Sequence, residues 1–166
     1  MEQLRNLSLQ ILDVVLQSPA TPEHRWILAA LAVIVSAFVF NKVCERLDLP
    51  NIGMFNGVLL TGLGFGLIVV GMAAGSIYLP DLKAQFGEMA FYGAVTAVVS
   101  VAVIVPLINM YIHGKFVGTL AAWSINLLTA ILFISFSGVV LDAVKAGERT
   151  FERGRAHNEA TKQLIK

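Results

Sequence analysis

Side chains that could carry out chemistry are scarce in this chain. It has three histidines and a single cysteine, Cys44, among 166 residues. The four longest apolar stretches contain no aspartate, glutamate or arginine, and their only lysine, Lys42, lies near the end of the first stretch. These residues support neither a cysteine-based metal cage, nor a haem held by two buried histidines, nor a Ser-His-Asp triad, nor paired catalytic carboxylates. We therefore expect no enzyme activity, no cofactor and no metal.

Amide, indole and hydroxyl groups are the polar chemistry that remains. Asn56, Asn109 and Asn126 fall in the same half of three successive apolar stretches, and Trp123 lies three residues before Asn126. Pro106 cannot donate a backbone hydrogen bond, so it frees a carbonyl one turn earlier and predicts a helix kink just before Asn109. Two interpretations are open. The polar groups hold the helices together, or they line a weakly polar pocket that contacts a lipid, a small neutral molecule or a partner subunit.

The elements that carry these groups are predicted to be membrane-spanning helices. The chain is 57% hydrophobic and only 14% charged, with a mean hydropathy of +0.75, whereas soluble domains contain about 25% charged residues. At about 1.5 Å per residue, twenty apolar residues cross a hydrocarbon core of about 30 Å. We predict an all-α, multi-pass protein whose membrane domain, residues 21–141, is a four-transmembrane-helix bundle with spans at 26–44, 53–79, 89–112 and 116–141. Asn41 and Lys42 are expected to reach the membrane interface.

The second span is unusually rich in glycine. At about 100° per residue, five of its glycines share one helix face and two lie on the opposite face. The first face carries Gly53, Gly57, Gly64, Gly71 and Gly75, and the opposite face carries Gly62 and Gly66. Small residues let helices approach closely in lipid. This pattern predicts a central helix packed on two faces. Either both faces are used within the protomer, or one of them docks a second copy or a partner subunit.

The flanking segments differ from the spans. Residues 1–18 are predicted to form an amphipathic interfacial helix, with Leu4, Leu7, Ile11, Val14 and Val15 on one side. Residues 142–166 are predicted to form a cytoplasmic helical tail. Nine of the twelve Lys and Arg residues fall on the side of both termini, which predicts that both lie in the cytoplasm, and we expect a bacterial inner membrane.

The function predicted from these features is that of a structural or accessory membrane subunit. Its expected partners are membrane lipid and either further copies of itself or other membrane-protein subunits. The alternative is a small channel or transporter for an ion or small neutral solute, formed between protomers. The net charge of +1 provides no basic surface for nucleic acid.

Overall fold

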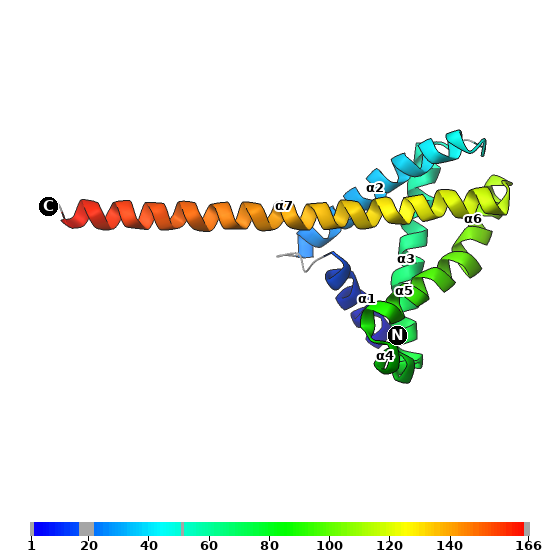
Figure 1. Cartoon of the computed structure of the whole chain (residues 1–166), viewed down its shortest axis with the longest axis horizontal. Coiled ribbons are helices and arrows are strands. Elements are labelled where there is room, and N and C mark those ends of the chain that lie inside the picture. The colour runs from blue at the N-terminus through cyan, green and yellow to red at the C-terminus, as the bar shows by residue number, and fades with distance from the viewer. Residues whose placement is uncertain (1, 17–21, 51, 165–166) are drawn as a thin grey trace. The chain divides into compact units, whose positions relative to one another are not determined.

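The structure is a computed structural model of the whole chain. It describes the backbone of residues 2–16, 22–50 and 52–164, and the side chains of 2–16, 24–50 and 52–140. Throughout this part of the chain every regular element is helical (Figure 1). The elements are α1 (Glu2–Val15), α2 (Pro22–Arg46), α3 (Met54–Tyr78), α4 (Pro80–Phe86), α5 (Glu88–Val99), η1 (Ser100–Ile104), α6 (Val105–Ile112) and α7 (Phe116–Leu164).

Four of the helical segments are long and apolar enough to cross a membrane. They are His24–Arg46, Met54–Tyr78, Glu88–Ile112 and Phe116–Val140. In hydrocarbon each backbone polar group needs a partner within the protein, and a continuous helix provides one for nearly all of them. The chain is therefore a multi-pass integral membrane protein, in agreement with the prediction from its apolar stretches.

The chain divides into two compact units, Met1–Ile134 and Ser135–Lys166. The first contains α1 to α6 and the beginning of α7. The second contains the rest of α7, whose helix continues to Leu164. The side chains of the predicted tail lie outside the described residues, as do residues 17 and 18 of the predicted N-terminal helix.

Helix boundaries in the first unit follow from local chemistry. Pro22 and Pro80 begin α2 and α4, where the missing proline N–H would have had no partner in the helix. Gly53 precedes α3 with φ 74°, a conformation that costs glycine little. Its Cβ position would meet nothing, so Gly53 acts in the turn before the helix. His113 is left-handed with φ 50° and ends α6, which allows the short turn before α7.

A π-helical segment, η1, interrupts the third span immediately before Pro106. The backbone N–H of Val105 donates to the carbonyl of Ser100, five residues earlier. Pro106 then lies at the start of the new helix α6, where its missing N–H is tolerated. This is the place where the sequence predicts a kink, and the third span is rewound there through a wider turn.

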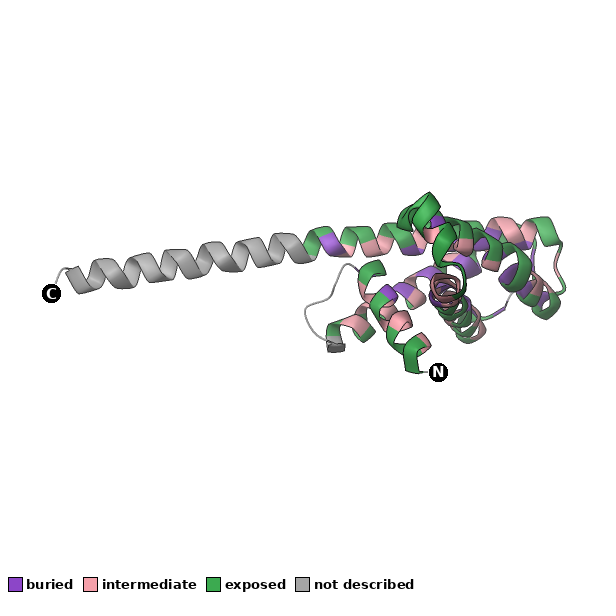
Figure 2. Ribbon diagram, turned by 90° about the horizontal axis from the view of Figure 1, so that it is seen from below, coloured by how far each residue is buried: buried purple, intermediate pink, exposed green. Residues whose placement is uncertain are grey.

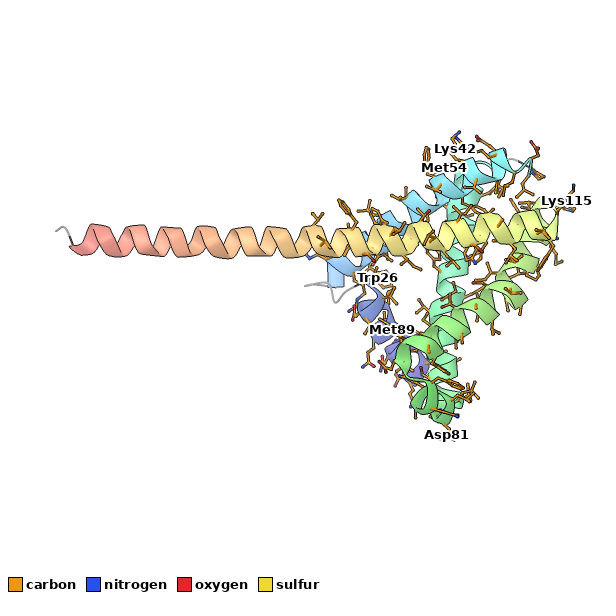
Figure 3. All side chains as sticks on the ribbon, in the orientation of Figure 1. Trp26, Lys42, Met54, Asp81, Met89 and Lys115 are labelled. Atoms are coloured by element: carbon orange, nitrogen blue, oxygen red, sulfur yellow. The ribbon has the colours of Figure 1, made fainter. Side chains whose placement is uncertain are left out.

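Helix α3 is the element against which most of the first unit packs. It contacts α1, α2, α4, α5 and η1. In Figure 3 the label of Met54 marks its first residue, and Asp81 is labelled in α4, the short helix that follows it. Figure 2 colours the ribbon by burial, and buried residues occur on several helices of this unit. The largest of them are Trp123, Phe40, Ile104 and Ile108, all at most 2% exposed.

Helix α1 lies against α3, with Ile11 buried in the contact and Leu16 buried just beyond its end. Val14 does not belong to that face, because 69% of it is exposed. The carboxylate of Asp13 instead turns toward α2 and pairs with Arg25. The arrangement of α1 therefore depends on a charged contact as well as on its apolar residues.

Candidate functional site: the buried polar contacts of the bundle

The candidate site begins where α3 and α7 face each other. Asn126 Nδ2 donates to Thr61 Oγ1 at 3.4 Å, and the indole of Trp123 lies on Gly64. The two pairs have the same spacing, because Thr61 and Gly64 are three residues apart on α3 and Trp123 and Asn126 are three apart on α7. All four residues are buried. Helix α3 thus presents the Thr61 hydroxyl and the space beside Gly64. Helix α7 presents the Asn126 amide and the Trp123 ring to them.

Trp123 fills the gap that Gly64 leaves. A Cβ atom at Gly64 would overlap the six-membered ring of the indole. Phe40 of α2 meets the same indole edge-on, with centroids 6.4 Å apart and planes at 83°, and Phe65 of α3 meets it at 5.8 Å and 54°. Such edge-on and tilted geometries are favourable for aromatic pairs. The indole therefore connects three spans through packing.

A second polar contact joins α6 to α7. The hydroxyl of Thr119 has two acceptors within reach, Asn109 Oδ1 at 3.1 Å and the carbonyl of Lys115 at 3.2 Å. Thr119 is fully buried. Asn109 of α6, predicted from its place in the third span, thus contacts α7, the helix that carries Trp123 and Asn126.

Asn56 has a different partner from the other predicted residues. Its Nδ2 donates at 3.1 Å to the carbonyl of Ile52, just before its own helix. This contact satisfies a backbone group at the start of α3, and Asn56 is only half buried. The structure therefore places Asn56 in a local contact, whereas Asn109 and Asn126 make contacts between helices.

Asn41 is a buried polar residue, and its burial was not predicted from the sequence. Lys42 is exposed and pairs with Glu45 at 2.9 Å, but Asn41 is only 9% exposed. Its Nδ2 lies 3.8 Å from the sulfur of Met54 and would be 2.9 Å from a Cβ atom at Gly57. The signal was available in the spacing Ala37, Asn41, Cys44, which places Asn41 on the apolar buried face of α2.

The remaining glycines of α3 differ in what they face. A Cβ at Gly71 would be 2.8 Å from Val99 Cγ2, and one at Gly75 would be 3.1 Å from the Phe91 ring. Gly71 and Gly75 therefore let α5 approach α3. This is the close approach expected of small residues between membrane helices.

The opposite glycine face of α3 is only partly covered. A Cβ at Gly62 would meet Val33 of α2 at 3.6 Å, which is an ordinary contact, whereas one at Gly66 would meet nothing within 4 Å. Gly66 is exposed. Within the described part of this protomer, no atom of another helix lies within 4 Å of a Cβ placed at Gly66.

Several buried polar atoms have no protein partner among the described residues. They are Asn126 Oδ1, Trp123 Nε1, Asn41 Oδ1, Ser36 Oγ and Ser100 Oγ. Ser36 and Ser100 were not singled out from the sequence, and only their exclusion from solvent distinguishes them. An unpaired buried polar group costs about 1–3 kcal/mol. These groups can donate or accept hydrogen bonds, but amides, hydroxyls and an indole provide no general acid or base near neutral pH.

The charged contacts lie near the helix ends. Arg25 binds Asp13 through two contacts, Nε to Oδ1 at 2.5 Å and a terminal nitrogen to Oδ2 at 2.7 Å. Lys83 of α4 lies 2.7 Å from Glu88 and 5.1 Å from the centre of the Tyr92 ring. The hydrogen bonds to Glu88 and then to Tyr92 raise the pKa of Lys83 above its usual value.

Among the residues that the structure describes, no group of three or more His, Cys, Asp or Glu side chains could hold a metal ion. Comparison of the chain with protein-family models, with curated proteins and with solved structures gives no match.

Proposed function

We propose that the protein is a structural or accessory subunit of the membrane, which self-associates or docks in a larger membrane complex. The observation that supports this most directly is the uncovered face of α3 at Gly66. In lipid, helices associate through close packing at small residues. Gly66 has open space beside it and lies on α3, which contacts most of the other helices. A helix from another chain could therefore pack closely against α3 at this position.

The spans offer ample surface for such a partner. In the most apolar window of each span only 28% to 33% of the residues are buried within the protomer. The most exposed of the other residues, such as Leu63 and Val98, are free to contact lipid or protein. A partner helix on α3 would gain contacts without breaking any that the protomer already makes.

Replacing Gly66 with leucine tests this proposal. We expect Gly66→Leu to keep the melting temperature of the protomer, because its side chain enters open space, but to weaken association by at least about tenfold, or about 1.4 kcal/mol. The native mass of the gently solubilised protein, measured with everything that co-purifies, is the readout. Gly93→Leu is the matched control, since a Cβ at Gly93 on α5 also meets nothing within 4 Å. An oligomer or complex that survives Gly66→Leu unchanged would overturn the proposal.

We further propose that both termini lie in the cytoplasm, with α1 as an amphipathic helix on that side. The excess of Lys and Arg on the side of both termini supports this orientation. Asp81 in α4 would then face the cytoplasm and Lys115, in the α6–α7 turn, the outside; both are exposed and are labelled in Figure 3.

Cysteine labelling in intact cells checks the orientation. In a Cys44→Ala background, we expect a membrane-impermeant maleimide to label Lys115→Cys at once and Asp81→Cys only after permeabilisation. The two positions serve as controls for each other. The opposite order of labelling would reverse the topology.

The channel or transporter predicted as the alternative gives a different result in liposomes. Purified protein should then support flux of an ion or neutral solute by itself, and Gly66→Leu should abolish that flux together with association. A subunit without transport activity shows no flux in either form.

A further inference from the structure

The first unit contains an apolar cavity that the polar contacts do not use. Its volume is about 260 Å³, and it lies among α1, α2, α3 and α7, with Thr96 of α5 at its border. The hydroxyl of Thr96 already donates to the carbonyl of Tyr92 at 2.8 Å, and every other lining side chain is apolar. A polar ligand would lose its hydrogen bonds there without replacement.

The size and lining of this cavity suit a hydrocarbon group. An apolar cavity of about 150 Å³ stays dry and is large enough to bind benzene. The present cavity is larger and is partly open to its surroundings, which for a membrane domain are lipid. Its lining extends from Leu12 on α1, and Leu16 just after α1, to Ile68 on α3 and Ala130 on α7.

Helix α1 forms one wall of the cavity, and an ion pair between Asp13 and Arg25 joins it to α2. Asp13 directly follows Leu12 in the sequence, and both of its carboxylate oxygens contact one edge of the Arg25 guanidinium, through Nε and a terminal nitrogen. The two side chains are 31% and 19% exposed, respectively. The atoms of the closest contact, Arg25 Nε and Asp13 Oδ1, are themselves buried, so another anion can bind there only by displacing the Asp13 carboxylate.

Arg25 is placed close to the same cavity. It lies four residues before Ala29, which lines the cavity, so the two residues share one face of α2 a single turn apart. Arg25 is also nearer the end of the span, where lipid headgroups would lie. A guanidinium binds a phosphate in the same two-pronged way as it binds a carboxylate.

We propose that this cavity and Arg25 together form a binding site for one phospholipid. One acyl chain occupies the apolar cavity, and the phosphate takes the place of Asp13 on Arg25. Helix α1 remains the wall over the acyl chain, and only the contact of Asp13 with Arg25 is given up when the lipid binds. The site is independent of whether the protein self-associates, because all its residues belong to one protomer.

Native mass spectrometry of the full-length protein in a non-ionic detergent, titrated with dioleoyl phosphatidylglycerol, tests the chain-binding part. We expect one phospholipid to bind per chain before any others. Ala130→Leu fills the cavity and should weaken this binding at least about tenfold. Ala97→Leu, at an exposed position on α5, is the matched control and should bind as the unchanged protein does. Equal binding by both variants would overturn the proposal.

Two substitutions in the ion pair test the headgroup part. Asp13→Asn removes the competitor for Arg25, so we expect phosphatidylglycerol and the zwitterionic dioleoyl phosphatidylcholine to bind more tightly. Arg25→Gln removes the phosphate ligand, so both lipids should bind more weakly. Changes of the same sign in both variants would show that the pair only holds α1 in place, and would overturn the role of Arg25.

The unchanged protein provides a measurement that does not depend on the folding of any variant. A phosphatidylcholine with a diazirine in the middle of one acyl chain is photolysed in complex with it, and the labelled residues are mapped. We expect saturable labelling of Leu12, Leu16 and Ile68. Labelling confined to outward-facing residues such as Leu63 and Leu67 would contradict the site.

Discussion

Trp123→Ala is expected to lower the free energy of unfolding of the bundle by about 3–5 kcal/mol, the range for removing a large buried aromatic side chain. The indole is 1% exposed and contacts Phe40, Phe65 and Gly64, so its loss empties a space bounded by three helices. In lipid the loss arises mainly from missing contacts and the cavity left behind, because apolar groups gain little by leaving hydrocarbon. Reversible unfolding in mixed micelles measures the change.

The second tryptophan provides the control for this experiment. Trp26 is 58% exposed, so Trp26→Ala should change the free energy of unfolding by no more than about 0.5 kcal/mol. Trp123→Phe should cost less than Trp123→Ala, since the indole Nε1 has no protein partner among the described residues and a phenyl ring keeps most of the packing. Similar losses at Trp26 and Trp123 would mean that Trp123 does not organise the bundle.

Gly64→Ala is expected to destabilise the protein by about 1–3 kcal/mol, which is the usual cost of overpacking a filled interior. The added methyl group would overlap the ring of Trp123, and the ring is held in place by Phe40 and Phe65. The sign is informative, because the same change within an unobstructed helix usually stabilises it by about 0.5–1 kcal/mol. Thermal unfolding of the purified variants measures the change.

Gly62→Ala is the matched control for this prediction. Its methyl group would meet Val33 at an ordinary 3.6 Å, so this variant should be as stable as the unchanged protein or slightly more so. The combination Gly64→Ala with Trp123→Phe should lose less than the sum of the two single losses, since the smaller ring yields space to the methyl group. Strict additivity would show that the two residues are not in contact.

The number of spans and their lengths could be predicted from the sequence alone. An apolar run of this length has to satisfy its backbone hydrogen bonds within itself, and that requirement does not depend on neighbouring helices. The boundaries followed from equally local chemistry. Pro22 begins α2, and the short turn from His113 to Lys115 separates the last two spans.

The faces on which the spans meet were less accessible to prediction. A leucine on a span loses little free energy whether it faces lipid or another helix, so hydropathy does not identify the buried side. Asn41 was expected at the interface and lies buried against Gly57, and Asn56 bonds to its own helix start. These positions depend on the shapes of the neighbouring helices.

The helical spans, their all-α class and their insertion into a membrane were thus determined by the sequence itself, because each depends on the composition of one continuous segment. Only the tertiary structure decided which polar groups meet, that Trp123 fills the gap at Gly64, and that Asp13 holds α1 beside the cavity through Arg25. Such contacts join residues that are distant in the chain. Their energies depend on how well two surfaces fit together, and this fit cannot be read directly from the order of residue types along the chain.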